Sequence, residues 1–282
     1  MVSILSLGTR GDHLKVFANR KLKKGEWLEI VPDRKEPSLG GDMTCHVSTE
    51  SVGCTVIKSQ EKEWLLQPSF PLSDLPEILI QFGDMPLPPY IKHTPLTRTQ
   101  QRMEYQSVFA KDDGSIAAPT ASLHFTKELL TEIEAAGHHI AYVTLHVHLG
   151  TFAPLTEEQW KSGALHLETY HIDEEAKGKI ENAKSNHHPV IAVGTTVVRT
   201  LESAADPDGQ IVRMSGETDL FIQEGHRFKV VDGLITNFHV PRSSLLMLIS
   251  TFAGRETILD LYGQAMEKKF RFFSFGDGML IV

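Results

Sequence analysis

The sequence predicts an α/β protein in which a mainly parallel sheet is flanked by helices, with a smaller antiparallel β-barrel-like domain before it. Three observations lead to this prediction. Short apolar or alternating runs fill residues 1 to about 75, a proline-rich stretch follows, and strand-like and helix-like runs then alternate to the end of the chain. Strands that alternate with helices are typical of a parallel sheet covered on both faces.

The first domain is predicted over residues 1–82. Turns rich in Gly, Pro and Asp separate short runs that read as strands, namely HLKVFANRKL, EWLEIVP, CTVIKS and EWLLQPSF. Strands of this length and spacing are typical of a small antiparallel sheet or barrel. The stretch DMPLPPYIKHTP, from Asp84, holds too many prolines for a helix or a central strand. We therefore expect a rigid connector there.

The second domain is predicted over residues 83–282. FTKELLTEIEAAG reads as a helix that Thr126 caps and Gly137 ends. The buried strands expected after it are HIAYVTLHVHLG, VIAVG and GLITNFHV. SSLLMLISTFAG, ending at Gly254, and TILDLYGQAMEKKF read as helices, and FFSFGDGMLIV reads as a closing strand. Ligands of parallel sheets bind beyond the carboxyl ends of the strands, so polar residues at those ends are the candidates for a site.

The composition is that of a globular protein: 282 residues, 41% of them hydrophobic, with a formal net charge of −8. No apolar run approaches the roughly 20 residues of a membrane helix, and we expect a cytoplasmic protein. Cys45 and Cys54 match no zinc spacing and cannot build a disulfide framework, so buried or half-buried reduced thiols are expected.

The acidic balance argues against a protein coated in nucleic acid, because lysine and arginine drive binding to phosphates. Basic residues nevertheless gather in two segments, one within residues 15–24 and one formed by Lys268, Lys269 and Arg271. Such clusters are usually solvated faces, and a nucleic-acid contact is the alternative.

The turn Gly194-Thr195-Thr196 joins a predicted strand to a predicted helix. Glycine lets the backbone approach a ligand closely, and the start of the helix offers free N–H groups and a positive dipole end. The alternative is that a threonine only caps the helix. Arg199 and Glu202 lie three residues apart on the next turn, so they could bind a ligand or pair with each other.

Histidines occur at the ends of several predicted elements. His146 and His148 point to the same face of a strand, which could begin a metal site, although no complete ligand set such as H-E-x-x-H is present. A single histidine acting as an acid, base or hydrogen-bond donor is the favoured interpretation. Asn237 and His239 follow another strand and could donate to a bound sugar or base, or Asn237 could hold a loop in place. His124 precedes a helix, and its role is left open in the same way, between a binding and a structural role.

Taken together, ordered blocks of the chain resemble one known family. They are GDMPLPPYI, EYQSVFA, AAPTASLHFT, VTLHVHLGTFAP, VIAVGTTVVRTLESAA, KVVDGLITNFHVPRSSLLMLISTFAGRE and FRFFSFGDGML. They are similar to the S-adenosylmethionine:tRNA ribosyltransferase-isomerase family of the queuosine pathway, densely over residues 83–282 and loosely before that. The resemblance implies an α/β domain with a small β-barrel domain, and it implies no metal.

The reaction that this resemblance implies moves the ribosyl part of S-adenosylmethionine onto 7-aminomethyl-7-deazaguanine in tRNA. The ribose rearranges, epoxyqueuosine forms, and adenine and methionine leave. We expect S-adenosylmethionine and tRNA as substrates. For proton handling we expect His146 and His239, with His124 third.

We assign binding roles within these motifs from sequence position and chemistry. The cofactor would be held by Gly194, Thr195, Thr196, Asn237 and Arg199. Arg271 and its neighbours Lys268 and Lys269 would meet the tRNA. The oligomeric state is left open.

Three departures from the family pattern keep alternatives open. Family members usually begin with further residues that include an FNNTRV-like motif, which the printed sequence lacks. His148 and Ser122 stand where the family usually has glycine, and IQEGHRF, from Ile222, places an acid in a segment expected near the ligand. The alternatives are a shortened, non-catalytic or repurposed relative that binds S-adenosylmethionine or a nucleoside, and a metal-assisted hydrolase that uses His146 and His148.

Overall fold

The computed structural model describes residues 4–18, 20–31, 52–60, 63–83, 87–88, 91, 95–111, 115, 118–147 and 155–282. These residues divide into two compact units. The first holds the described residues up to Leu87 and those from Ile91 to Arg102, and the second holds Pro88 and the described residues from Met103 onward. The sequence-based boundary between residues 82 and 83 stays a prediction. Most of the proline-rich connector and all of Cys45 lie outside the described residues.

The first unit is an antiparallel sheet with the strand order β1-β2-β5-β4-β3. Its strands are β1 (Ile4–Arg10), β2 (His13–Ala18), β3 (Trp27–Glu29), β4 (Gly53–Gln60) and β5 (Glu63–Pro68). Among the described residues, the edge strands β1 and β3 each pair with one neighbour and not with each other. The sheet is therefore open, and the barrel-like prediction is wrong. Alternating residues such as Val16, Val56 and Leu66 face one core, which also buries the free thiol of Cys54.

Short helices complete this part of the chain. They are η1 (Leu72–Asp74), α1 (Leu75–Phe82) and α2 (Arg98–Glu104). Leu72 and Leu75 pack against the core of the sheet, which anchors η1 and the start of α1 to it. Arg102 of α2 donates to the carbonyl oxygens of Leu79 and Gly83, at 2.8 and 2.7 Å, and so satisfies two acceptors at the end of α1.

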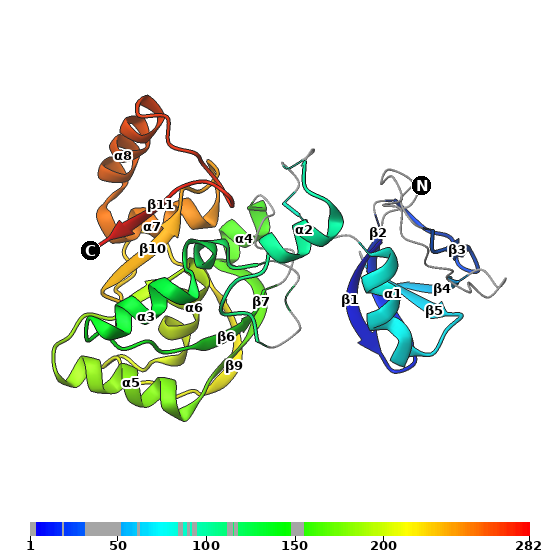
Figure 1. Ribbon diagram of the computed structural model, residues 1–282, viewed down its shortest axis with the longest axis horizontal. Coiled ribbons are helices and arrows are strands. Elements are labelled where there is room, and N and C mark those ends of the chain that lie inside the picture. The colour runs from blue at the N-terminus through cyan, green and yellow to red at the C-terminus, as the bar shows by residue number, and fades with distance from the viewer. Residues whose placement is uncertain are drawn as a thin grey trace. The chain divides into compact units, whose positions relative to one another are not determined.

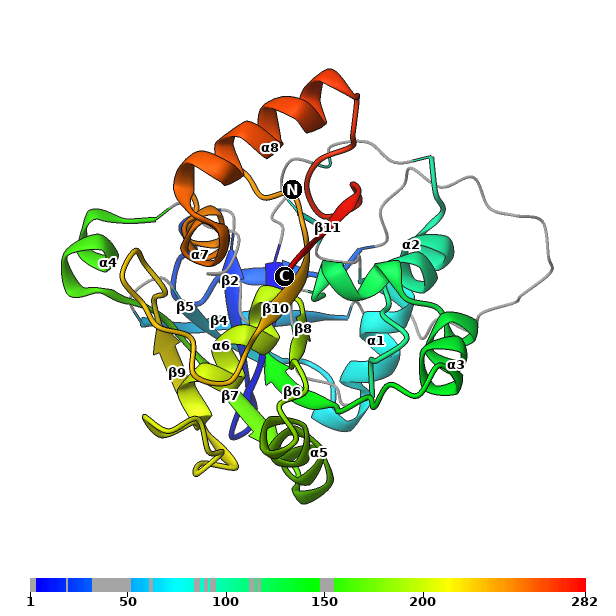
Figure 2. The same cartoon turned by 90° about the vertical axis from the view of Figure 1, so that its left-hand side faces the viewer.

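The second unit contains two three-stranded sheets (Figures 1 and 2). One has the order β6-β7-β9 and is antiparallel throughout. The other has the order β11-β10-β8, with β10 parallel to β8 and antiparallel to β11. The strands are β6 (Val143–His146), β7 (Ala164–Ile172), β8 (Ile191–Val193), β9 (Ser215–Leu220), β10 (Gly233–Asn237) and β11 (Gly278–Ile281).

The prediction of a mainly parallel sheet is therefore wrong, because only β8 and β10 pair in parallel among the described strands. The physical reason lies in β7 and β9, which were not recognised as strands. They form antiparallel partners for β6 and for each other, so the chain passes from one sheet to the other through α5 instead of returning to the same sheet. The exposed side chains of β7 include the polar residues His166, Thr169 and His171, which weaken its apolar pattern.

The helices of this unit are η2 (Thr120–His124), α3 (Lys127–Ala135), α4 (Glu157–Ser162), α5 (Glu174–Ser185), α6 (Thr195–Ala204), α7 (Ser244–Ala253) and α8 (Arg255–Glu267). Four of them, α3, α6, α7 and α8, form where the sequence predicts helices, whereas η2, α4 and α5 were not predicted. The predicted cap is confirmed, since the Thr126 hydroxyl accepts from the Leu129 N–H at 3.2 Å. Gly254 ends α7 with φ +85° and begins α8. No helix in the described ranges is long and apolar enough to cross a membrane.

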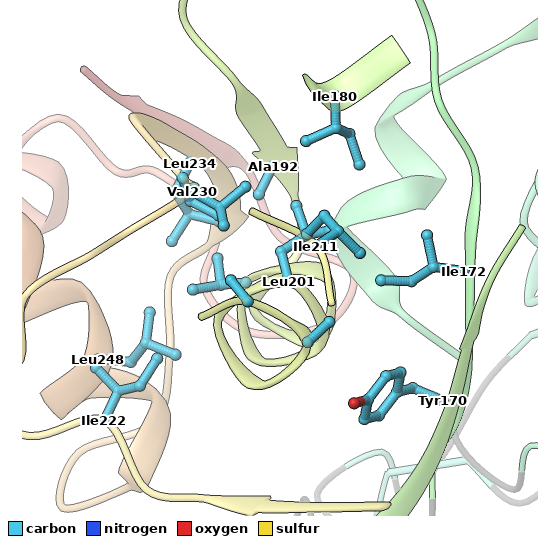
Figure 3. Packing of buried hydrophobic residues seen from close by; sticks show 14 of the residues in the cluster. Tyr170, Ile172, Ile180, Ala192, Leu201, Ile211, Ile222, Val230, Leu234 and Leu248 are labelled. Carbon is cyan, nitrogen blue, oxygen red and sulfur yellow. The ribbon is translucent and has the colours of Figure 1, made fainter. Parts of the chain in front are cut away.

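Helix α6 lies between the two sheets and forms the centre of the core (Figure 3). It contacts β6 and β9 of one sheet and β8 and β10 of the other. Val198 and Leu201 are buried against side chains from both directions, including Ile172 of β7 and Leu234 of β10. Because the helix is buried on nearly all sides, its first turn stays in a fixed place relative to the ends of β8 and β10.

Candidate functional site

A cleft opens in the second unit where β8 and β10 end. It is lined by residues 118–121, Val147, residues 194–196, residues 236–240, Leu245, Phe273 and Ser274. The space is about 640 Å³ when its open mouth is included. Five residues singled out in the sequence therefore lie in one cleft, namely Gly194, Thr195, Thr196, Asn237 and His239.

The first turn of α6 forms one wall of this cleft. Gly194 has φ +95°, a conformation that L side chains rarely adopt, and its N–H donates to the Ile235 carbonyl at 2.8 Å. The N-cap residue is Gly194 itself, without a side-chain capping bond, so the alternative that a threonine caps the helix is wrong. Thr195 and Thr196 are the first helical residues, and N–H groups in a first helical turn have no intrahelical acceptor.

His239 brings an ionisable group into the cleft. Its Nε2 lies 2.9 Å from the Thr236 hydroxyl, and its backbone N–H donates to the Tyr262 hydroxyl at 2.7 Å. The residue keeps some exposed surface, but the protein around the ring removes most of its water. This burial lowers the pKa of His239 to about 4, because a charged imidazolium would lose its hydration. The ring is therefore neutral at pH 7.

Asn237 connects three segments of the cleft. Its Nδ2 donates to the Phe273 carbonyl at 3.2 Å, with the Gly276 carbonyl at 3.4 Å, and it lies 3.2 Å from Nε2 of His124. Its Oδ1 is 3.5 Å from the Thr120 hydroxyl. The interpretation that Asn237 holds a loop agrees with these contacts. Because the amide nitrogen is committed to protein acceptors, only Oδ1 is left to serve the predicted cofactor contact.

Phe273 and Ser274 were missed in the sequence as members of the site. Phe273 has φ +72°, which is strained for an aromatic residue, and it is held there because its N–H donates to the Phe238 carbonyl at 3.0 Å. Ser274 is buried. The block FFSFGDG contains a usable signal, since two glycines follow closely after the aromatic run. A Cβ at Gly276 would lie 2.4 Å from the Arg271 carbonyl oxygen.

The other two predicted histidines lie outside the lining of the cleft. His124 is exposed at the end of η2 and reaches the site only through Asn237. His146 ends β6 and pairs with Thr169 of β7, whereas the next residue, Val147, lines the cleft. Neighbouring side chains of a strand point to opposite faces, which explains why only one of the two takes part. His148 lies outside the described residues.

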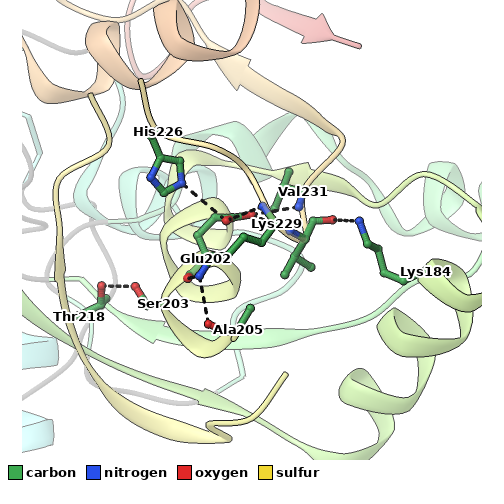
Figure 4. Close-up of polar contacts among 9 residues, drawn as sticks. Lys184, Glu202, Ser203, Ala205, Thr218, His226, Lys229 and Val231 are labelled. Atoms are coloured by element: carbon green, nitrogen blue, oxygen red, sulfur yellow. Dashed lines mark hydrogen bonds and ion pairs between the residues drawn. The ribbon is translucent and has the colours of Figure 1, made fainter. Parts of the chain in front are cut away.

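Arg199 and Glu202 do not pair with each other. Arg199 forms a buried ion pair with Glu168 of β7 and donates from Nε to the Leu220 carbonyl at 3.1 Å, and it does not line the cleft. Glu202 has no exposed side-chain surface and accepts from the backbone N–H groups of residues 229–231 at 2.9–3.1 Å (Figure 4). Both residues hold the fold together around α6.

Comparison with known proteins shows the family to which this chain belongs. The sequence model of the queuosine biosynthesis protein family matches residues 4–281. The chain belongs to this family. The S-adenosylmethionine:tRNA ribosyltransferase-isomerase of Desulforamulus reducens is 46% identical over 96% of this chain and 78% of its own length. The enzyme of the same name from Caldanaerobacter subterraneus subsp. tengcongensis is 42% identical over the same shares.

A solved structure is also similar to this member of the queuosine biosynthesis family. It is the S-adenosylmethionine tRNA ribosyltransferase of Thermotoga maritima, with 28% sequence identity and a TM-score of 0.48, over all of this chain and 75% of that one.

The predicted tRNA-contacting residues of this family member are exposed and follow α8. Lys268 is the C-cap of the helix, and Lys269 has φ +58°. Arg271 forms a bidentate contact with Asp277, through Nη2 to Oδ1 at 2.7 Å and through its backbone N–H to Oδ2 at 2.8 Å. This contact holds the pKa of Asp277 below its usual range and closes the 271–277 turn beside the cleft.

The described part of this chain contains no ligand set for the alternative of a metal-assisted hydrolase. No group of three or more His, Cys, Asp or Glu side chains there could hold a metal ion. The acid expected near the ligand, Glu224, lies in an exposed turn and is not part of the cleft lining.

Proposed function

We propose that this protein transfers and isomerises the ribosyl group of S-adenosylmethionine onto 7-aminomethyl-7-deazaguanine in tRNA, which gives epoxyqueuosine and releases adenine and methionine. Family membership and the names of relatives at 42–46% identity support this proposal. The observation that carries it is chemical. Among the described residues that line the cleft, His239 has the one ionisable acid–base side chain, and burial keeps it uncharged at pH 7.

A neutral imidazole suits the first step of this reaction. The sulfonium of S-adenosylmethionine acidifies the hydrogens on the neighbouring ribose carbon, C5′, and a base must remove one of them. His239 begins as a base and not as an acid, since it carries no extra proton at pH 7. Once protonated, a buried imidazolium is a strong acid, so it would pass the same proton to the departing adenine.

The first turn of α6 would bind the polar part of the cofactor. The N–H groups of Thr195 and Thr196 and the dipole of a ten-residue helix favour a negatively charged group. The carboxylate of the methionine portion is such a group. Gly194 would allow close approach, because it carries no side chain on the cleft wall.

The decisive assay follows adenine and methionine. The purified protein is incubated with S-adenosylmethionine and with tRNA that carries 7-aminomethyl-7-deazaguanine, and we expect equal amounts of both products. Cofactor binding without release would favour the alternative of a repurposed binding relative. Release that depends on an added divalent metal would contradict the proposed mechanism.

Variants test which histidine moves the proton. His239→Ala should lower kcat by about 10²–10⁴-fold while the Kd for S-adenosylmethionine stays within about threefold. His146→Ala and His124→Ala are the comparison, because both residues lie outside the cleft lining. His188→Ala, at an exposed position, controls for loss of a histidine. If His146→Ala or His124→Ala loses more turnover than His239→Ala, the assignment of the base is wrong.

A further inference from the structure

The cleft contains a buried hydroxyl whose partner is the ring of His239. Thr236 is 1% exposed, so its hydroxyl cannot bond to bulk water and must find a partner in the protein. The structure gives it His239 Nε2 at 2.9 Å. The other ring nitrogen, Nδ1, has no hydrogen-bond partner among the described residues.

The backbone of His239 is fixed as well. The hydroxyl of Tyr262, in α8, accepts a hydrogen bond from the His239 N–H at 2.7 Å. The Tyr262 ring packs edge-on against Phe238 and Phe272, with ring centroids 5.2 and 5.6 Å away. Tyr262 is therefore held by its own neighbours. A contact at the backbone and a contact at Nε2 together leave the imidazole little freedom to rotate.

We propose that Thr236 is a positioning residue for His239: its hydroxyl oxygen accepts a hydrogen bond from the Nε2–H group, so that the lone pair of Nδ1 is the basic site offered to the substrate. A neutral imidazole carries one proton, and a bond at one nitrogen selects which nitrogen is the base. If the hydroxyl instead donated to Nε2, the ring proton would lie on Nδ1, and the one basic lone pair of the ring, on Nε2, would already be occupied by the hydroxyl. Only the expected effect of this contact on catalysis depends on the proposed function.

Charged neighbours do not affect how the pKa of His239 reports this contact. Burial is the cause of its lowered pKa, with no contribution from a charged neighbour. From α8 the titratable group in contact is Tyr262, whose burial raises its pKa to about 12, so it stays neutral. The side chains of β10 and residues 273–274 that line the cleft carry no charge. A substitution of Thr236 that alters this contact should therefore change the pKa of His239 directly.

The first test uses the unaltered protein. Nitrogen-15 NMR of histidine-labelled protein distinguishes an imidazole protonated at Nε2 from one protonated at Nδ1, and the His239 signal is assigned by its loss in His239→Gln. We expect the Nε2–H form. Finding the proton on Nδ1 overturns the proposal, whatever the enzymatic assay gives.

The second test removes the hydroxyl. Thr236→Val keeps the shape of the side chain, and it should lower kcat on the order of a hundredfold with an unchanged KM for S-adenosylmethionine. Thr236→Ser, which restores the hydroxyl, should recover most of the rate. The pKa of His239 should move down in Thr236→Val, because an acceptor at Nε2 stabilises the imidazolium more than the neutral ring. An upward shift would identify Thr236 as a donor and contradict the proposal, as would a wild-type rate.

Controls separate this proposal from the proposed function. Thr131→Val, on the exposed face of α3, should change neither the rate nor the titration. Tyr262→Phe removes only the acceptor of the His239 N–H, and it should lower kcat without moving the proton from Nε2. If the wild-type protein releases no adenine, the proposed function fails, while the NMR results still decide the Thr236 contact.

Discussion

Asn237 and His124, 113 residues apart in the sequence, meet through a contact of 3.2 Å between Nδ2 and Nε2. The same amide nitrogen donates to the Phe273 carbonyl. Three segments around the cleft therefore depend on one buried side chain, which makes the amide a sensitive position for substitution.

Replacing Asn237 by Asp should destabilise the protein. A carboxylate cannot donate to the Phe273 and Gly276 carbonyls, so it would leave a buried charge facing two acceptors. We expect the free energy of unfolding to fall by about 3 kcal/mol, measured by urea denaturation. Asn186→Asp also loses a donated bond but lies in an exposed helix end, and it should cost less than about 1 kcal/mol. Equal losses would show that the amide contacts do not matter.

Two glycines should respond in opposite directions to alanine. At Gly276 a Cβ would lie 2.4–2.6 Å from the Arg271 and Phe272 backbone, which cannot yield easily. Gly276→Ala should cost about 1–3 kcal/mol. Gly263, inside α8, has no atom within 4 Å of that position, so Gly263→Ala should add about 0.5–1 kcal/mol. Thermal unfolding of both variants checks the prediction, which fails if Gly276→Ala unfolds at or above the wild-type temperature.

Glu202 should be a major contributor to stability, because its carboxylate accepts from three backbone N–H groups. In Glu202→Gln an NH₂ group meets those donors, and we expect a loss of about 3 kcal/mol in the free energy of unfolding. Glu217→Gln, on exposed β9, is the matched control and should change it by less than about 0.5 kcal/mol. Hydrogen exchange at residues 229–231 should rise only in Glu202→Gln.

Stability should fall with acidification because of His239. Its pKa is lowered from 6.5 to about 4 in the folded protein, so the unfolded chain binds the proton more readily between these values. The contribution is therefore complete above pH 6.5 and is lost as the pH falls to about 4. It amounts to at most about 3 kcal/mol.

His239→Gln provides the measurement of this effect. The difference in unfolding free energy between wild type and variant should shrink between pH 6.5 and pH 4, as urea denaturation at several pH values would report. A difference that stays constant over this range would rule out a buried neutral histidine.

Binding of tRNA should depend on the basic residues after α8. If Lys268 and Lys269 contact phosphates, their joint replacement by alanine should weaken binding and lower the slope of log affinity against log salt by about 2. Lys127→Ala combined with Lys161→Ala removes the same charge elsewhere on the surface. The proposed contact is wrong if the two double variants lose the same slope.

Local signals were sufficient for part of the fold and of the site. Thr126 caps its helix and Gly254 ends another because each acts on the neighbouring turn. The turn at Gly194 and the strand end at Asn237 were predictable for the same reason. Strand β7 was not, since most of its exposed side chains are polar and its partners lie far along the chain.

The sequence by itself determined four helices of the second unit, the ordered motifs of the queuosine biosynthesis family and the placement of polar residues at strand ends. The tertiary structure alone decided that most strands pair antiparallel, that Arg199 pairs with Glu168, and that His239 is neutral. The division has a physical cause. Caps and turns depend on residues a few positions apart, whereas strand pairing and desolvation depend on groups that only folding brings together.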